Sequence, residues 1–261
     1  MSKNIKDSKK SKIIKDFKIA VLTGNIPKME ELLGKHNEVI QQLINEKDDL
    51  LLITASARGY TNAVEILLEK GFDVNEKNEN GDSALLIAVL NNNRDVLELL
   101  LEYGADINNK NNAGETPLIK AADAGNIPIL KKLLQKGADV NAKDEDGNTA
   151  LIIAASENEK PDGVYLLITA GADVNATDNN GMNALAIARE RVRKNPKMVH
   201  MLENAHAYMG IQALNPHVGN ALYGDESIKD LFEFAKGKGK GKSRKTRKTR
   251  KTRKRTRSIK R

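Results

Sequence analysis

The sequence has 261 residues, with no cysteine, no tryptophan and an aromatic content of only 3%. Without cysteine the chain can form no disulfide, no thiolate nucleophile and no cysteine-ligated metal site. Large aromatic rings usually supply much of the buried area of a compact core, and here Leu, Ile, Val and Ala must supply it. The composition therefore suits a thin, layered structure better than a deep globule.

Long apolar runs are also missing. No stretch approaches the ~20 apolar residues that a transmembrane helix needs. The first 15 residues are rich in lysine, but the apolar segment that should follow the basic start of a secretory signal peptide does not follow. We therefore expect a protein that has no membrane span, is not secreted, and works inside the cell, in the cytoplasm or the nucleus.

The net charge of +8 combines two regions of opposite sign. From Lys236 to Arg261 the sequence has 16 Lys and Arg and no acidic residue. Residues 1–235 contain 27 basic and 35 acidic residues, so their net charge is −8. An acidic body thus precedes a basic tail, and the two regions should attract different partners.

Two series of glycines repeat at the same spacing of 33, 33 and 34 residues. The first series opens segments such as Gly-Glu-Thr-Pro-Leu, and the second opens segments such as Gly-Ala-Asp-Val-Asn. The glycines of the two series are Gly81, Gly114, Gly147 and Gly181, and Gly71, Gly104, Gly137 and Gly171. Because two motifs stay in step for four periods, the sequence predicts an array of structural repeats.

One repeat, residues 113–145, shows what each unit should form. Thr116 can cap a first helix, and the proline after it is tolerated in the first turn. Gly125 then breaks the chain before a second helix that carries an apolar stripe. Gly137 can end that helix in the left-handed conformation, and a polar hairpin-like turn follows. A unit of this kind cannot bury its apolar face alone, so it must stack on neighbours.

The segments Gly114–Leu118 and Gly137–Asn141 resemble the ankyrin repeat family, and the resemblance covers about residues 47–205. It implies an all-α solenoid of stacked helix-turn-helix units joined by hairpin-like loops. The sequence divides into five repeats, 47–79, 80–112, 113–145, 146–179 and 180–212.

The remaining segments are assigned from composition and from weaker echoes of the repeat. We expect a basic, disordered N-terminus over 1–15 and a degenerate N-terminal capping repeat over 16–46. A C-terminal capping segment with a short helix is expected over 213–235. Residues 236–261 form a Lys/Arg-rich tail that cannot bury a core and should be disordered.

Two departures from the family pattern stand out. The histidine that commonly follows Thr-Pro-Leu is replaced by Leu86, Ile119, Ile152 and Ala186. Its usual hydrogen bonding between repeats must therefore be lost or replaced. One extra residue near Glu159-Lys160 should distort the turn between the two helices of that repeat.

No pattern in the sequence indicates catalysis. His200 and His206 are six residues apart and do not share a helical face, so they do not suggest a zinc site. Gly241-Lys242-Ser243 resembles the end of a phosphate-binding loop, but Lys236 stands where that motif requires glycine. We predict no catalytic, cofactor-binding or metal-binding residue, no cofactor and no small-molecule substrate; the protein is not expected to be an enzyme.

The family resemblance implies a concave recognition surface formed by the hairpin tips and the inner helices, which binds a protein. Positions that stacking does not use supply the candidate contacts. On the hairpins these are Lys77, Asp82, Lys110, Glu115, Asp144, Asn148 and Met182, and on the inner helices Arg58, Leu90, Asn91, Asp123, Ser156, Glu157 and Glu190. Acidic residues are prominent from Glu115 onward, so a basic or polar protein partner would suit the surface. A monomer is expected.

The tail has several interpretations. Its candidate contact residues are Lys242, Arg244, Lys245, Arg247, Lys248, Arg250, Lys251, Arg253, Lys254, Arg255 and Arg257. A dense Lys/Arg run is typical of nuclear-targeting segments read by an import receptor, and of segments that bind nucleic acid or anionic surfaces. Two alternatives follow. In the first, the repeats are the main binding element. In the second, the tail is the main binding element of a nucleic-acid-associated protein, and the repeats are an adaptor.

Overall fold

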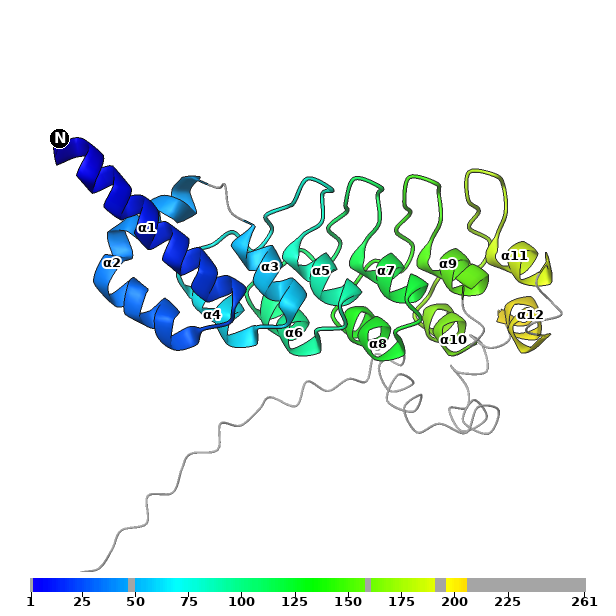
Figure 1. The fold of residues 1–261 in the computed structure, drawn as a ribbon. Helices are drawn as coiled ribbons and strands as arrows, with labels where there is room; N and C mark the ends of the chain where they lie inside the picture. The colour runs from blue at the N-terminus through cyan, green and yellow to red at the C-terminus, as the bar shows by residue number, and fades with distance from the viewer. Residues whose placement is uncertain (1, 47–49, 158–160, 191–195, 206–261) are drawn as a thin grey trace, which may run out of the picture.

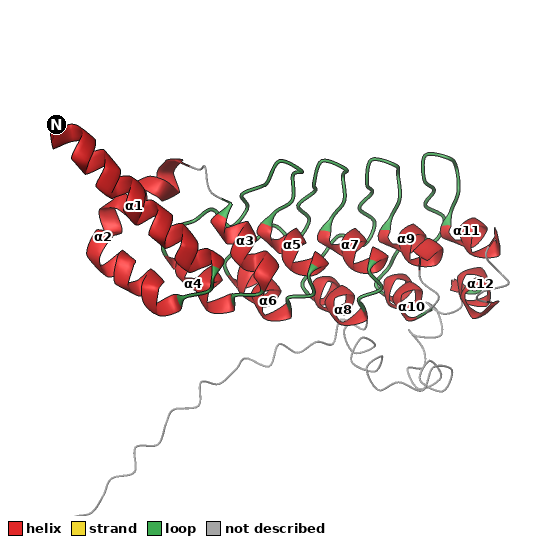
Figure 2. Cartoon of the chain, in the orientation of Figure 1, coloured by secondary structure: helices red, strands yellow, loops and turns green. Residues whose placement is uncertain are grey.

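The computed structural model describes residues 2–46, 50–157, 161–190 and 196–205, and within them the chain forms α-helices joined by turns and loops (Figures 1 and 2). The helices are α1 (Ser2–Leu22), α2 (Ile26–Glu46), α3 (Leu51–Arg58), α4 (Thr61–Glu69), α5 (Ala84–Leu90), α6 (Arg94–Glu102), α7 (Pro117–Asp123), α8 (Ile127–Gln135), α9 (Ala150–Glu157), α10 (Asp162–Thr169), α11 (Ala184–Glu190) and α12 (Pro196–Glu203).

The helices from α3 onward form two parallel rows. Helices α3, α5, α7, α9 and α11 stack on one another in the first row, and each packs against the helix that follows it in the chain. The long loops between successive pairs all project from the same side of the array (Figure 1). This arrangement confirms the predicted all-α solenoid, and one helix pair lies within each of the five repeat ranges assigned from the sequence.

The first helices α5, α7, α9 and α11 each begin at a residue whose side chain caps them, whereas Leu50 before α3 makes no side-chain cap. Oγ1 of Thr116 accepts a hydrogen bond from the backbone N–H of Ile119 at 3.2 Å, as the sequence predicts, and Pro117 occupies the first turn. Ser83, Thr149 and Asn183 cap their helices in the same way. The cap satisfies one of the N–H groups that a helix start otherwise leaves without a partner.

The core consists of aliphatic layers between successive pairs. Leu52, Leu85, Leu118 and Leu151 are fully buried in the first row of helices, where each Leu contributes about 1.5–3 kcal/mol. The alanines three residues later are also fully buried and allow the stacked helices to approach closely. The family's histidine position is filled by the buried, apolar Leu86, Ile119 and Ile152, so in these repeats packing replaces polar contacts.

The repeated glycines allow the hairpin tips to touch. Gly114 has φ +73°, and a Cβ atom built there would lie 2.7 Å from the backbone nitrogen of Glu145 in the next hairpin. That nitrogen donates to the carbonyl oxygen of Ala113. In the same way, the backbone N–H of Asn112 donates to the carbonyl oxygen of Asn80, and that of Asn179 donates to the carbonyl oxygen of Asp146. The glycine period therefore records a close approach between neighbours as well as a turn.

The N-terminal unit differs from the prediction. Residues 1–15 were expected to be disordered, but α1 begins at Ser2, so that expectation is wrong. Phe17 of α1 and Met29 of α2 are fully buried between the two helices and α3. Ala20 and Val21 are buried with Phe17 at helical spacing, so an apolar face holds the C-terminal half of the lysine-rich helix against the core. Helix α2 is 21 residues long with a kink at His36, so this unit is larger than a repeat helix pair.

Several sequence-based assignments lie outside the described residues. These are the extra residue near Glu159-Lys160, the capping segment 213–235 and the basic tail 236–261. They stay predictions.

Candidate protein-binding surface

A hollow of about 370 Å³ opens between the hairpin loops and the first row of helices. Its wall combines residues from two neighbouring repeats, which are Asn80, Asp82, Leu90, Asn111, Asn112, Ala113, Glu115 and Lys120. Three predicted contact residues, Asp82, Leu90 and Glu115, thus meet at one place.

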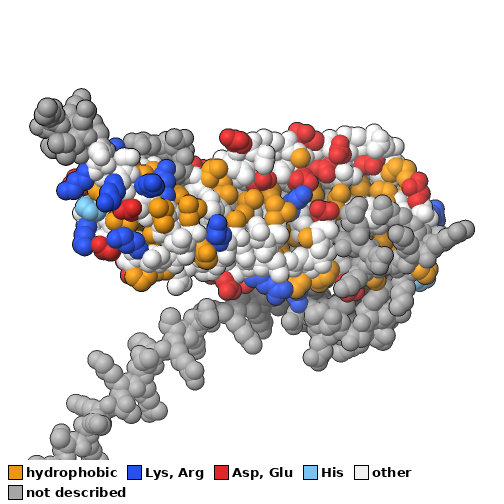
Figure 3. Space-filling model, in the orientation of Figure 1, with side chains coloured by type: hydrophobic (Ala, Val, Ile, Leu, Met, Phe, Trp, Pro, Cys, Tyr) orange, Lys and Arg blue, Asp and Glu red, His pale blue; other side chains and the backbone are white. Residues whose placement is uncertain are grey.

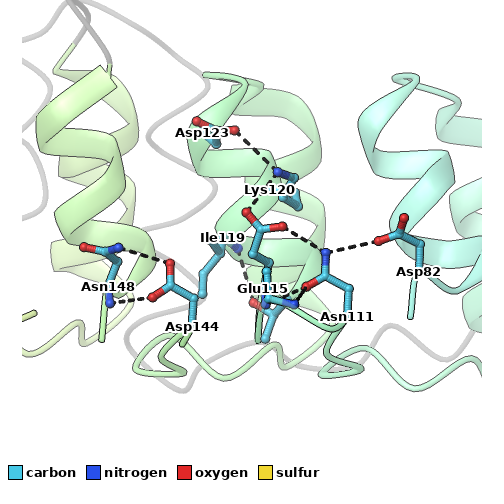
Figure 4. Close-up of polar contacts among 10 residues, drawn as sticks. Asp82, Asn111, Glu115, Ile119, Lys120, Asp123, Asp144 and Asn148 are labelled. Carbon is cyan, nitrogen blue, oxygen red and sulfur yellow. Dashed lines mark hydrogen bonds and ion pairs between the residues drawn. The ribbon is translucent and has the colours of Figure 1, made fainter. Parts of the chain in front are cut away.

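A chain of polar contacts fixes one wall of the hollow (Figure 4). The Nδ2 group of Asn111 donates to Oδ1 of Asp82 at 3.1 Å and to Oε2 of Glu115 at 2.9 Å. Nζ of Lys120 lies 3.0 Å from Oε1 of Glu115 and 3.8 Å from Oδ2 of Asp123. The contacts link two repeats, so the wall is held in place before any ligand binds.

The carboxylate of Asp82 is part of that wall rather than a freely exposed contact. The residue is only 8% exposed, and Oδ2 also accepts a 3.4 Å hydrogen bond from Asn78. The side chain of Lys120 is 18% exposed, although Ile87 and Ile153 stand at its equivalent positions in the neighbouring repeats. A charged residue at a position that is apolar in both neighbouring repeats makes this part of the array distinct.

Leu90 gives the hollow an apolar side. It is 44% exposed at the end of α5, whereas the equivalent positions in later repeats hold Asp123, Ser156 and Glu190. Large apolar side chains beside a hollow are favoured anchors of protein interfaces. The hollow therefore offers both an apolar contact and a fixed set of charges.

The predicted contacts Lys77 and Lys110 have a role within the array. Nζ of Lys77 donates to the carbonyl oxygen of Lys110 at 2.8 Å, and Nζ of Lys110 donates to that of Lys143 at 2.6 Å. Lys143 continues the series to the carbonyl oxygen of Thr177 at 2.7 Å. We call Lys77, Lys110 and Lys143 the lysine ladder. Their spacing of 33 residues in the sequence is a signal for this role, whereas Lys77 and Lys110 were predicted as partner contacts.

An asparagine ladder joins the same hairpins at their bases. Its members are Asn75, Asn108 and Asn141, and the side-chain oxygen of each accepts a 2.8 Å hydrogen bond from the backbone N–H of an aspartate in the next repeat. These residues share the 33-residue period but are not among the contacts predicted from the sequence. The two ladders make the hairpin loops a continuous, hydrogen-bonded row.

The hairpin loops also carry nearly all of the net negative charge of the repeats. Residues 51–190 contain 22 acidic and 12 basic residues, a net charge of −10. The four hairpin loops, which we define as 73–82, 106–115, 139–148 and 173–182, contain 12 acidic residues and three lysines, a net charge of −9. Figure 3 shows acidic side chains gathered along the loops, whereas Lys and Arg gather over α1 and α2.

A family model for ankyrin repeats in three copies matches residues 17–111, 55–144 and 118–213. The chain belongs to the ankyrin repeat family. Ankyrin repeats are in general protein–protein interaction modules, and proteins of this family are typically scaffolds without catalytic activity. The array thus serves to bind a protein partner of some kind. A search of curated proteins finds no match to the chain.

The other hairpin candidates of the ankyrin array lie at the third and fourth loops. Asp144 accepts from the backbone N–H of Asn148 at 2.7 Å and from its side-chain amide at 3.2 Å. Met182 is half-buried, and its backbone N–H donates to Asp178. These residues shape their own loops and are not part of the hollow.

The remaining helix candidates of the ankyrin array are spread along it. Arg58, Asn91 and Glu190 are exposed at the ends of their helices, and Asn91 donates to the carbonyl oxygen of Ile87. Ser156 is half-buried and donates to the carbonyl oxygen of Ile153. Glu157 is the last residue of α9, and its side chain lies outside the described part of the structure.

Across the described ranges, no group of three or more His, Cys, Asp or Glu side chains could hold a metal ion. In the same part of the chain, none of the helices combines the length and apolar character that a membrane crossing requires.

Proposed function

We propose that this protein is a non-enzymatic scaffold that binds its partner on the concave surface of the ankyrin array, with the hollow beside Leu90 at the centre of the contact. The observation that carries the proposal is the combination of an exposed leucine with a fixed polar wall in the same hollow. An apolar anchor enclosed by ordered polar groups is the usual arrangement of an interface centre. The partner is a protein with a basic or polar contact surface, and the scaffold itself is monomeric.

Differential affinity capture tests the concave site. The full chain and its Leu90→Arg variant are used as baits in the same cell extract, and the captured proteins are compared. Ile19→Arg is the matched control, because Ile19 is 48% exposed on α1, away from the hollow. The proposal requires at least one protein that the full chain and the control retain and Leu90→Arg loses. Identical sets of captured proteins for all three baits would overturn it.

For the basic tail, we propose a role in nuclear targeting or in non-specific attachment to nucleic acid or another anionic surface. The supporting observation is the run of 16 basic residues without an acid between Lys236 and Arg261. Such a segment binds phosphates by charge alone, with strong dependence on salt. The protein would then act in the cytoplasm or the nucleus, according to whether the tail is read by an import receptor.

An alternative proposal makes the tail the primary binding element of a nucleic-acid-associated protein, with the repeats as adaptor. Filter binding of duplex DNA by the full chain and by a chain ending at Ala235, each at two salt concentrations, distinguishes the two roles. Salt-sensitive binding that disappears with residues 236–261 favours the alternative. Absence of DNA binding by the full chain overturns it and leaves targeting, which a comparison of cellular localisation with and without these residues tests.

A further inference from the structure

The hairpin loops and the C-terminal segment carry large charges of opposite sign. The four loops have a net charge of −9, and residues 236–261 have a net charge of +16. Both belong to one chain, so the local concentration of the segment near the loops is high and does not depend on the protein concentration. Each region is therefore a large counter-charge for the other within the same molecule.

The segment can reach any part of the array. Thirty residues separate Ala205 from Lys236, and an extended chain spans at most about 3.3–3.6 Å per residue, or on the order of 100 Å here. Packed helices are about 8–10 Å apart, so the five stacked first-row helices extend over roughly 40 Å. Reach therefore does not limit which hairpin the segment can contact.

The loops present carboxylates for which the array has no cation. Glu79, Glu145 and Asp146 are exposed at the tips and form no ion pair among the described residues. Nζ of each lysine in the lysine ladder is hydrogen-bonded to a backbone carbonyl of the next hairpin instead. A cation for these carboxylates must come from outside the array.

The hollow is suited to the side chains that such a segment offers. Leu90 and Ala113 expose apolar surface that can cover the aliphatic part of a Lys or Arg side chain. Asp123, whose side chain is 47% exposed, lies at the edge of the same polar chain and can accept from the charged end. Apolar surface next to acceptors matches long basic side chains better than it matches a small cation.

We propose that residues 236–261 dock on the hairpin loops and the hollow of their own chain. Single exposed ion pairs stabilise a complex little, so the docking depends on many of them and on the shared chain. It is therefore sensitive to salt, since exposed charges are screened over about 10 Å at 0.1 M. The inference goes beyond the proposed function, because it needs no partner and concerns a contact within one molecule.

The docked segment would cover the face that we assign to the protein partner. A partner on the concave surface and a polyanion on the tail would each compete with the internal contact. By linkage, an anion that binds the tail raises the affinity of the array for its partner, and the partner raises the affinity of the tail for the anion to the same extent. The two halves of the protein would thus be coupled without a change of fold.

Paramagnetic relaxation measures the contact directly. The chain has no cysteine, so Ser243→Cys introduces a single site for a nitroxide label within the segment. Backbone amide signals of the hairpin tips, such as those of Asn80, Ala113 and Asp146, should broaden more than signals of α4, α6 and α8. Addition of about 1 M NaCl, where screening acts over roughly 3 Å, should remove the difference.

Two variants with the same net charge distinguish docking on the hairpin loops from a general effect of net charge. E79Q/E145Q/D146N removes three carboxylates at the hairpin tips, and E65Q/E69Q/E102Q removes three exposed carboxylates on α4 and α6. All six side chains are exposed, so both variants should keep the fold. We expect loss of the selective broadening in the first variant and its retention in the second.

Three results would overturn the inference. The first is that the hairpin signals do not broaden. The second is that the hairpin signals and those of α4, α6 and α8 broaden equally. The third is that the two variants have equal effects. Broadening of the same size in a mixture of isotope-labelled chains and separate nitroxide-labelled chains would assign the contact to a second copy and would also overturn the inference. None of these outcomes affects the capture test with Leu90→Arg, so the two proposals can fail separately.

Discussion

The middle of the array and its two ends are stabilised in different ways. In the middle, each hairpin is joined to both neighbours, as at Asn108, which accepts from Asp139. At the C-terminal end, no hairpin after that of Asn175 and Thr177 lies within the described residues, and among them a Cβ atom at Gly181 would meet nothing within 4 Å. At the N-terminal end, Lys28 and Lys35 pair with Glu31 within one helix. The polar contacts in the middle thus join successive repeats, whereas those named at the N-terminal end lie within one helix.

The largest expected effect is a cavity in the middle of the stack. Leu151 is buried in α9 between α7 and α11, whereas the equivalent Leu185 in the last repeat is only partly buried. We expect Leu151→Ala to cost about 2–5 kcal/mol of unfolding free energy and Leu185→Ala clearly less. Urea unfolding followed by circular dichroism measures both. Equal losses would contradict the distinction between the middle and the end.

A smaller effect is expected from the close contact of the hairpin tips. Gly147 and Gly181 have φ +79° and +77°, so alanine at either position introduces backbone strain of roughly 1–2 kcal/mol. Only at Gly147 would the new Cβ collide, at 2.6 Å from Oδ1 and 2.9 Å from the backbone nitrogen of Asn179. Gly147→Ala should therefore be the more destabilising by about 1–3 kcal/mol.

Thermal unfolding of the two alanine variants, measured side by side, provides the comparison. Gly181→Ala is the control for strain, because it has the same backbone conformation without the neighbour. If both variants lose the same stability, the tips can separate at no cost and the hairpin row is not rigid.

The asparagine ladder should contribute less than the tip contacts. Asn108→Ala removes the acceptor of the Asp139 N–H, which water can partly replace because the bond is exposed, so we expect a loss of ~0.5–1.5 kcal/mol. Asn175→Ala, the control at the end of the ladder, should lose almost nothing. Amide hydrogen exchange at Asp139 measures the local effect. An unchanged rate in Asn108→Ala would show that the ladder does not order the hairpins.

The sequence predicts the local structure within each repeat. The cap at Thr116 and the left-handed Gly137, with φ +88°, are confirmed, because both depend on neighbours within a few residues. Because the sequence is periodic, the structure predicted for one repeat applies to the other repeats of the stack. The fold and the family could therefore be predicted from the sequence alone.

The candidate surface was harder to predict, because the environment of a side chain depends on the repeat 33 residues away. Asp82 and Lys77 look like free surface residues in the sequence, yet both bond to the following hairpin. The hollow beside Leu90 also exists only when two repeats stack. At the N-terminus, the abundance of lysine concealed the apolar residues around Phe17 that order α1.

The smallest expected effect concerns the local ion pairs of the N-terminal unit. Hydrogen bonds from Lys28 and Lys35, with their positive charges, lower the pKa of the Glu31 carboxyl from 4.5 to about 2. Because this pKa is lower in the folded state, the pairs stabilise the fold above pH ~4.5, and the contribution is lost as the pH falls toward 2. The groups are exposed, so the gain in stability is slight.

The double substitution Lys28→Gln with Lys35→Gln should return the pKa of Glu31 toward 4.5, as measured by NMR titration of its carboxyl carbon. Lys12→Gln on the exposed face of α1 is the control and should leave that pKa near 2. Because these contacts lie within one helix, amide exchange in α7 should be the same in all three proteins. Faster exchange in α7 of the double variant would show that these ion pairs also stabilise the middle of the array. The N-terminal unit and the middle would then differ only in how far their contacts act.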